Sequence, residues 1–227
     1  MIFNIDLHTH TSRYSPCSVL SPQTLCETAI SRGLHALVIT EHNVQWSPAE
    51  IADLQAQYPA LKLYAGVEIS VDDDHHYGVI GLPAGQYEPS PMSYTQFKAL
   101  MAAHPDAFAF LAHAFRYSDD EHGLEDKPVV ALELGNWNML ARPQPPDGPI
   151  QYRHFDLYLK WQRKMGWIAL YNSDSHAVPM VGTFYNQIEV DRIPPDEQAL
   201  VHVLRRRPMQ GHQDRELIRK SVNNGLW

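Results

Sequence analysis

The sequence contains few cysteines and no long apolar run. Its only two cysteines are Cys17 and Cys26, so a disulfide-stabilised secreted domain is not expected. No run of eighteen apolar residues occurs, which excludes a membrane-spanning helix, and the first motif begins at Asp6, which leaves no space for a signal segment. From these absences we expect a cytoplasmic protein that does not enter a membrane.

Basic side chains are also scarce. Lys and Arg together number 18, against 26 Asp and Glu, which gives a formal net charge of −8. An extended nucleic-acid surface requires an excess of Lys and Arg, so we expect no such surface here. The length of 227 residues and the 44% content of hydrophobic residues suit one sizeable α/β domain, while the oligomeric state stays open.

Histidine, by contrast, is abundant, with 13 residues, and two of them follow an apolar run at the start of the chain. Residues Ile2–Ile5 are predicted to form a strand. Since strand side chains alternate between faces, Asp6, His8 and His10 are predicted to point the same way. Neutral imidazole is the commonest metal ligand, and a nearby carboxylate can fix its tautomer. A metal site is therefore indicated if other strands supply further ligands.

The rest of the chain alternates between apolar segments and segments with helix-capping residues. Further strands are predicted at Leu34–Thr40, Lys62–Val71, Tyr77–Leu82, Ala107–Ala112, Val129–Leu134, Trp167–Tyr171 and Thr183–Val190. Helices are predicted at Pro22–Arg32, Pro48–Tyr58, Met92–His104, Tyr152–Met165, Pro195–Arg206 and Asp214–Val222. This order predicts a mainly parallel sheet in a distorted (β/α)7 TIM-like barrel, a single domain over residues 1–227 with residues 183–227 packed on the barrel. The proline-rich stretch Arg142–Pro149 is predicted to be a surface loop.

Metal-ligand residues fall at the C-terminal ends of several predicted strands. In a parallel barrel these ends form one rim, where the active sites of such folds lie. A mixed set of imidazoles and carboxylates favours Zn, Mn or Fe over Mg or Ca, which prefer oxygen ligands. The residues predicted to converge there are His8, His10, His42, Glu68, His113, Asp174 and His176.

Six short motifs resemble those of the polymerase and histidinol phosphatase (PHP) family of metal-dependent phosphoesterases. In chain order they are DLHTHT from Asp6, TEH at Thr40–His42, GVEIS at Gly66–Ser70, HYGVIGL from His76, LAH ending at His113, and SDSH at Ser173–His176. The resemblance implies a distorted seven-stranded barrel that binds two or three divalent metal ions. It also implies hydrolysis of a small phosphorylated metabolite or nucleotide by a metal-activated water.

The same resemblance implies a ligand set. His8, His10, Glu68 and Asp174 would bind the first ion, Glu68 would bridge to a second ion with His76 and His113, and His42 and His176 would bind a third. Of the adjacent His75 and His76, the family spacing favours His76. Glu68, Asp174 and Asp6 are the candidate catalytic residues, with Asp6 either orienting a ligand histidine, which we favour, or accepting a proton.

Two positions differ from the family pattern. The first loop offers Cys17 where the family commonly has a further His or Asp ligand for the third ion, so this site is expected to be weak, absent or completed by Cys17. Position 41 is Glu instead of the usual Asp, and we expect only local hydrogen bonding to change. For substrate binding, Arg116 and Arg13 are the candidates, because a guanidinium donates two parallel hydrogen bonds to phosphate. A surface pairing of Arg116 with Asp119 or Asp120 is the alternative.

Two other functions remain to be distinguished from a phosphoesterase. An amidohydrolase-type hydrolase of C–N or ester bonds also uses two histidines on its first barrel strand and a late aspartate. Such enzymes often bridge their metals with a carboxylated lysine, and the bridging position here is predicted to be Glu68. The third possibility is a metal-binding module of this family without catalytic turnover.

Overall fold

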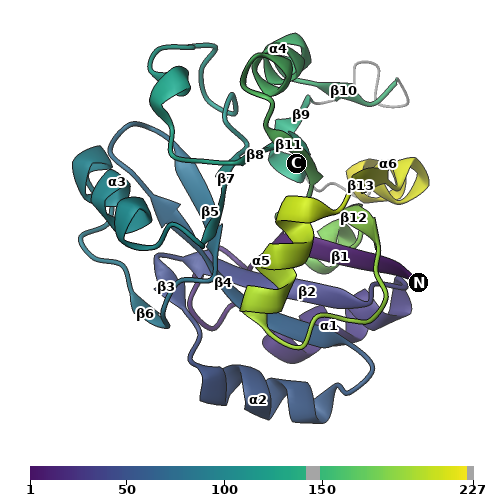
Figure 1. The fold of residues 1–227 in the computed structure, drawn as a ribbon. Helices are drawn as coiled ribbons and strands as arrows, with labels where there is room; N and C mark the ends of the chain where they lie inside the picture. Colours follow the sequence, from purple (N-terminus) through teal and green to yellow (C-terminus); the bar gives the residue numbers. More distant parts are fainter. Residues whose placement is uncertain (142–148, 224–227) are drawn as a thin grey trace.

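The computed structural model describes residues 1–141 and 149–223. Within these ranges, nine strands form one strongly curved sheet (Figure 1). In spatial order they are β11 (Ile168–Tyr171), β8 (Ala131–Gly135), β7 (Phe108–Ala112), β5 (His76–Ile80), β4 (Lys62–Ser70), β2 (Ala36–His42), β1 (Ile2–Thr9), β12 (Phe184–Glu189) and β13 (Met209–Gln213). Seven of these strands follow one another around the barrel in chain order, which confirms the predicted distorted barrel. They are β1, β2, β4, β5, β7, β8 and β11.

Six helices surround this sheet in the described part of the chain. They are α1 (Pro22–Ser31), α2 (Pro48–Gln57), α3 (Tyr94–Ala103), α4 (Phe155–Met165), α5 (Glu197–Arg206) and α6 (Arg215–Asn223). The hydroxyls of Ser21, Ser47 and Ser93 each accept a hydrogen bond from a first-turn backbone N–H, which explains where α1, α2 and α3 begin. All six predicted helices are present, with ends shifted by a few residues.

Short elements connect these strands and helices. Within the described residues, two small antiparallel pairs are formed by β3 (Val44–Gln45) with β6 (Gly85–Gln86) and by β9 (Leu140–Ala141) with β10 (Gln151–Tyr152). The same part of the chain contains three 3-10 turns, at Leu124–Asp126, Trp137–Met139 and Val178–Met180. The sequence analysis predicted neither these pairs nor β13. Of the predicted surface loop Arg142–Pro149, residues 142–148 lie outside the described part of the chain.

The sheet is less parallel than predicted, because β5 runs antiparallel to both of its neighbours, β4 and β7. Only residues 71–75 separate β4 from β5, whereas a parallel crossover needs a dozen or more residues. The reversal places His76, the first residue of β5, beside Ser70 and Ala112, the last residues of β4 and β7. His76 therefore lies at the same rim as the C-terminal ends of the parallel strands.

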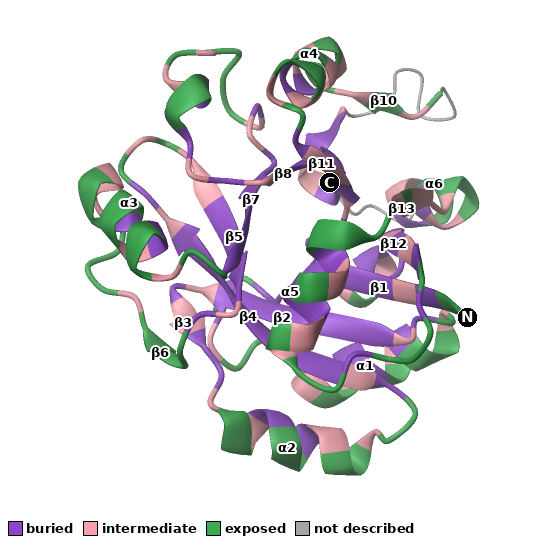
Figure 2. Cartoon of the chain, in the orientation of Figure 1, coloured by how far each residue is buried: buried purple, intermediate pink, exposed green. Residues whose placement is uncertain are grey.

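The barrel interior is filled with apolar side chains. Helix α5 closes the end of the barrel at which the parallel strands begin. Leu200, Val201 and Leu204 of α5 pack against the same cluster as Phe3 and Phe110 from the inner faces of the strands. Figure 1 shows α5 lying across the front of the barrel, and Figure 2 shows that the strands behind it are buried. On the outside, α1 and α2 cover β2 and β4, whereas α3 and α4 cover β5, β7 and β8. The remaining opening is the C-terminal rim.

None of the described helices has the length and apolar character needed to cross a membrane.

The two edges of the sheet approach each other where β11 faces β12 and β13. Asn186 of β12 is fully buried, and its side-chain amide accepts a hydrogen bond from Tyr171 N at 2.9 Å and donates one to Tyr171 O at 2.8 Å. On β13, a Cβ at Gly211 would lie 1.9 Å from the Tyr171 ring, so this position requires glycine. A side-chain amide thus substitutes for strand pairing at the seam of the barrel.

We expect Asn186→Ala to lower the free energy of unfolding by roughly 2–4 kcal/mol, because it leaves a partly buried backbone N–H and C=O of Tyr171 without the Asn186 side chain as partner. Urea denaturation measures this loss. Gln187→Ala is the matched control, since the next side chain along β12 makes one hydrogen bond, to Asn4. Equal losses in the two variants would contradict the role assigned to Asn186.

Candidate metal centre

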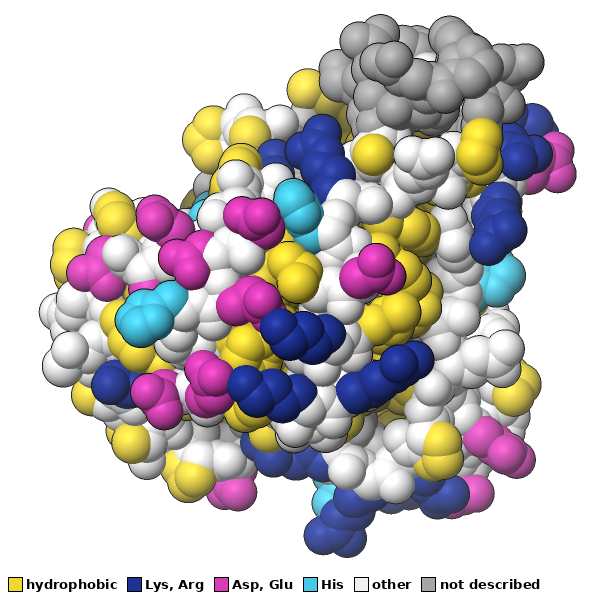
Figure 3. Space-filling view, turned by 90° about the horizontal axis from the view of Figure 1, so that it is seen from above, with side chains coloured by type: hydrophobic (Ala, Val, Ile, Leu, Met, Phe, Trp, Pro, Cys, Tyr) yellow, Lys and Arg dark blue, Asp and Glu magenta, His cyan; other side chains and the backbone are white. Residues whose placement is uncertain are grey.

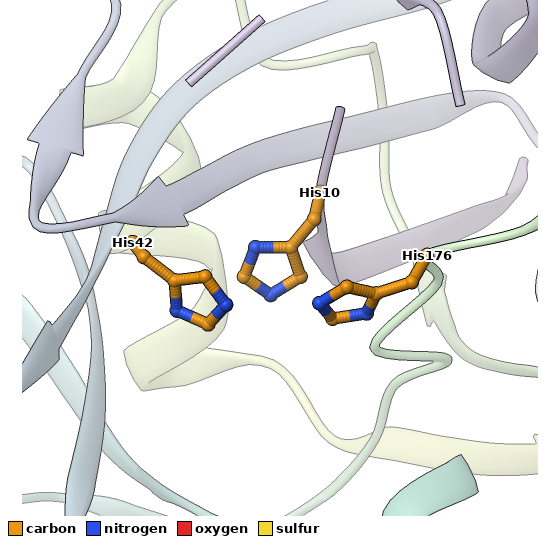
Figure 4. Close-up of side chains that lie close together, drawn as sticks. All are labelled: His10, His42 and His176. Atoms are coloured by element: carbon orange, nitrogen blue, oxygen red, sulfur yellow. The ribbon is translucent and has the colours of Figure 1, made fainter. Parts of the chain in front are cut away.

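The structure brings all eight predicted ligands to one rim of the barrel, from six segments of the chain. His8 lies near the end of β1 and His10 just after it, His42 ends β2, Glu68 lies near the end of β4, His76 begins β5, His113 follows β7, and Asp174 and His176 follow β11. Figure 4 shows the imidazoles of His10, His42 and His176 close together, with the His10 ring between the other two. The ring centroids of His42 and His176 lie 4.4 Å and 4.3 Å from that of His10.

Glu68 lies at the middle of this cluster. Its side chain is fully buried, and both of its oxygens face imidazole nitrogens. The contacts are Oε2 with His8 Nε2 at 3.4 Å, His10 Nε2 at 3.3 Å and His42 Nδ1 at 2.8 Å, and Oε1 with His76 Nδ1 at 3.0 Å and His113 Nε2 at 3.2 Å. Burial raises the pKa of Glu68, but the charge on His8 and hydrogen bonds from neighbouring histidines outweigh it and bring the pKa well below its usual range. The carboxylate is therefore ionised.

Asp174 provides the second buried carboxylate. Its Oδ1 lies 3.1 Å from His10 Nε2 and 3.4 Å from His8 Nε2, while its Oδ2 accepts a hydrogen bond from the Asn138 side chain. The backbone at Asp174 has φ +51°, and His113 has φ +29°. Positive φ at residues other than glycine is strained, and such residues concentrate at functional sites.

The donor set has the properties of a cation site. Imidazole nitrogens lie close to the buried oxygens Glu68 Oε2 and Asp174 Oδ1, but none of them is aligned to donate a hydrogen bond, although buried carboxylate oxygens normally accept one. The Nε2 atoms of His8 and His10 lie only 3.0 Å apart and face the same space as these oxygens. Buried acceptors that converge in this way are stabilised by a divalent cation, so the residues present fit the metal ions that the sequence predicted.

Three groups of side chains have potential ligand atoms within 4.8 Å of one another. They are His8, His10 and Asp174; His42, Glu68 and His76; and His10, His42 and His176. The first two groups overlap with the first and second ligand sets that the family resemblance implied. The third differs from expectation, since His10 joins His42 and His176. Among the described residues, Cys17 belongs to none of these groups.

Outer hydrogen bonds orient the ligand histidines. His8 Nδ1 lies 2.9 Å from Glu133 Oε1, and His176 Nδ1 lies 2.9 Å from the backbone oxygen of Asp174. His10 Nδ1 contacts Ser15 Oγ at 3.2 Å, and this hydroxyl donates to Glu41 Oε2 at 2.6 Å. With Nδ1 of each ring donating outward, Nε2 keeps its lone pair for a metal.

Glu133, on β8, contacts the candidate ligands but was not predicted from the sequence. It is fully buried, and besides His8 it accepts hydrogen bonds from the side chains of Asn136 and Asn172 and from His113 N. Its position near the end of a predicted strand, in the segment Glu133–Asn136, was the available signal. Nothing in the sequence, however, showed that its side chain would reach a histidine on β1.

Asp6 does not lie beside the ligand imidazoles, so the prediction that it shares a face with His8 and His10 is wrong. The register of β1 against β2 shifts between Asp6, which pairs with Leu37, and Thr9, which pairs with Ile39. Such a bulge inserts one residue and changes which side chains face inward. Asp6 Oδ1 instead accepts hydrogen bonds from the backbone N–H groups of His8 and Ser173, and burial raises its pKa to about 7.

A cavity of about 390 Å³ opens over the cluster, and Arg116 and Cys17 are among the residues that line it. Arg116 makes no ion pair with Asp119 or Asp120, which are both described. Arg13 lies outside this cavity and pairs with Glu50, so the structure leaves Arg116 as the better-placed candidate for substrate. Cys17 is exposed, and partial desolvation and the nearby carboxylates raise the pKa of its thiol.

We expect Glu133→Gln to weaken metal binding by about 10- to 100-fold, because the carboxylate that fixes the His8 tautomer is replaced by an amide. Titration with a competing chelator gives the metal dissociation constant. Glu125→Gln is the matched control, since Glu125 is exposed and pairs with Lys164 on the surface. An unchanged affinity in Glu133→Gln would show that the His8 contact does not support the metal site.

Comparison with known proteins agrees with this geometry. The family model of the PHP domain matches residues 6–202. The 5'-3' exoribonuclease Rnm of Salmonella typhimurium is 35% identical over 79 residues, and the match covers 34% of this chain but only 26% of that enzyme.

Solved structures share the fold at low identity. PsfC from Pseudomonas syringae has a TM-score of 0.66 at 16% identity, with 98% of this chain and 97% of that chain covered. A two-domain Bacteroides vulgatus protein containing a predicted PHP-like metal-dependent phosphoesterase has a TM-score of 0.66 at 15% identity, with 99% and 70% covered. The lesion-specific endonuclease PfuEndoQ from Pyrococcus furiosus has a TM-score of 0.62 at 16% identity, with 92% and 58% covered. On the match over residues 6–202, this chain belongs to the PHP domain family.

Proposed function

We propose that the protein is a metal-dependent phosphoesterase that hydrolyses a small phosphorylated metabolite or nucleotide. The observation that carries the proposal is Glu68, a buried carboxylate whose two oxygens face imidazoles on opposite sides. Such a carboxylate can bridge two metal ions. Two divalent ions held by these residues would supply an activated water for attack at phosphorus and charge stabilisation for the leaving oxygen. Zn, Mn or Fe suits this mixed ligand set best.

The residues of the chain take separate roles in this proposal. Glu68, Asp174 and the histidines bind and space the ions, and Arg116 binds the phosphoryl group from the cavity wall. Asp6 is a positioning residue, because it accepts hydrogen bonds from the backbone at His8 and Ser173 and so fixes β1 against the segment that carries Asp174. No protein nucleophile is required.

An amidohydrolase-type reaction is less well supported. A carboxylated lysine commonly bridges the metals of such enzymes, and the described residues that line the metal cavity include no lysine. The buried Lys127 has its ammonium 2.6 Å from Asp73 Oδ2, where it is already paired. The completeness of the ligand set also argues against a non-catalytic module.

The substrate proposal favours a small molecule over a nucleic-acid chain. The face of the protein in Figure 3 carries acidic and basic side chains intermixed, without one continuous basic stripe. Two of the proteins that the chain resembles are named as nucleases, and this is in tension with the expectation that the protein has no extended nucleic-acid surface. Since the exoribonuclease match covers about a quarter of that enzyme, its substrate does not transfer directly. The cytoplasmic location and the single domain remain predictions.

A substrate screen tests the proposed function. We expect metal-loaded protein to bind about two or more equivalents of Zn, Mn or Fe and to hydrolyse a phosphomonoester or phosphodiester. Glu68→Ala should lower this activity at least about 100-fold, because the ions lose their common ligand. Circular dichroism checks that the variant is folded. Amide hydrolysis without phosphoester hydrolysis would favour the amidohydrolase alternative, and metal binding without any turnover would favour a non-catalytic module.

We expect Arg116→Ala to lower kcat/KM on the best phosphoester by about tenfold to a hundredfold, with metal content unchanged, because a charge-assisted contact to phosphate is lost. Arg13→Ala is the matched control. Its guanidinium is paired with Glu50 and lies outside the metal cavity, so kcat/KM should stay near that of the parent. Equal kcat/KM values in the parent and Arg116→Ala would show that the ions bind the phosphoryl group without this arginine.

A further inference from the structure

A second, larger cavity adjoins the metal centre. It has a volume of about 1040 Å³, and it shares His76, His113 and Tyr117 with the smaller cavity over the ligands. Two of these three residues belong to the predicted ligand set, so the larger cavity opens directly beside the expected position of the phosphoryl group. The part of the substrate beyond its phosphorus therefore has space to extend into this cavity.

Tyr117 stands at the junction of the two cavities. Tyr117 is 73% exposed, so its ring is open to a ligand in either cavity. The guanidinium of Arg116, the candidate phosphate ligand, lies 4.8 Å from the Tyr117 ring centroid. An exposed ring at this place offers a face on which planar groups stack favourably.

We propose that Tyr117 determines substrate specificity by stacking on a planar aromatic group that the phosphoester carries beyond its phosphorus. This inference rests on the proposed phosphoesterase function and names the class of substrate for the same site. Arg116 and Tyr117 are neighbours in sequence, so one short segment contacts both the phosphate and the group attached to it. The two contacts then select phosphoesters in which the ring lies close to the phosphate.

The charges around the larger cavity limit what else the substrate carries. The side chains of Asp74, Asp120 and Asp126 line the cavity and form no ion pair with any described residue. The cavity lining also includes Lys127, whose ammonium is paired with Asp73, and several histidines. A cavity wall with unpaired carboxylates accepts a neutral or cationic ring and repels additional phosphates.

Two other carboxylates, in the segment between β7 and β8, are neutralised by lysines. Glu121 pairs with Lys160 at 2.5 Å, and Glu125 pairs with Lys164 at 2.8 Å, both from helix α4. Asp120 and Asp126 of this segment, in contrast, line the cavity without an ion pair. This distribution favours a single aromatic phosphoester over a nucleic-acid chain, whose further phosphates would have to pass these carboxylates.

The test compares two non-hydrolysable ligands of equal charge and similar size, benzylphosphonate, which has a planar ring, and cyclohexylmethylphosphonate, which does not. Isothermal titration calorimetry gives their dissociation constants for metal-loaded parent, Tyr117→Phe and Tyr117→Ala. We expect the parent to bind benzylphosphonate about fivefold or more tightly than cyclohexylmethylphosphonate, which is the gain expected from one stacked ring. Tyr117→Phe should keep this preference, and Tyr117→Ala should lose it.

The ratio of the two dissociation constants is the decisive readout. A loss of affinity that is common to both ligands reports a displaced Arg116, whereas a change in the ratio reports stacking. An unchanged ratio in Tyr117→Ala, or no binding of either ligand to the parent, would overturn the inference. Because phosphonates bind without being hydrolysed, a Tyr117-dependent ratio in a protein that cleaves no phosphoester would refute the proposed function alone.

Discussion

Burial of the Glu68 carboxylate among five imidazoles is the constraint on which the rest of the barrel mouth depends. A buried carboxylate is destabilising unless cations or hydrogen-bond donors compensate for its lost hydration. Here the imidazole nitrogens near Glu68 Oε2 and near Oδ1 of Asp174 are not aligned to donate hydrogen bonds to these oxygens. The protein places these acceptors together with imidazole lone pairs, an arrangement that a divalent cation stabilises. Metal binding and the stability of this rim are therefore physically linked.

A second layer of polar side chains holds the ligands in place. Glu133 contacts His8 and accepts hydrogen bonds from two asparagines, and Asn138 holds the Oδ2 oxygen of Asp174. On the opposite side, Glu41 is fully buried and binds the hydroxyl of Ser15, which contacts the His10 ring. Because each outer carboxylate accepts several donors, the ligand rings are fixed before any ion binds. This rigidity also explains how strained backbone at His113 and Asp174 is tolerated.

The space around the metal centre is asymmetric in size and charge. A small cavity lies over the ligands, and a larger one with acidic walls lies beside it, and both are bounded by Tyr117. The metal ions would compensate for the negative charge of Glu68 and Asp174. The carboxylates that line the larger cavity would keep their negative charge. Members of one fold family can thus share a metal centre and still differ in substrate, because the walls of the second cavity come from loops that vary independently of the barrel.

The sequence by itself determined the barrel and most of the metal centre. Apolar segments, serine caps and first-turn prolines are local signals, so the seven barrel strands and six helices could be predicted with only their ends displaced. The positions of His8, His10, His42, Glu68, His113, Asp174 and His176 at strand ends follow from the same local pattern. Their convergence requires only that the strands share one direction at the rim.

Only the tertiary structure decided the direction of β5, the bulge in β1 and the partners of the ligands. The bulge turned Asp6 away from the ligand face because strand register depends on the neighbouring strand, not on alternation within one strand. Glu133 reaches His8 over 125 residues of sequence, and Asn186 joins the barrel edges by contacting Tyr171. Such contacts depend on packing between distant segments, which no local pattern encodes.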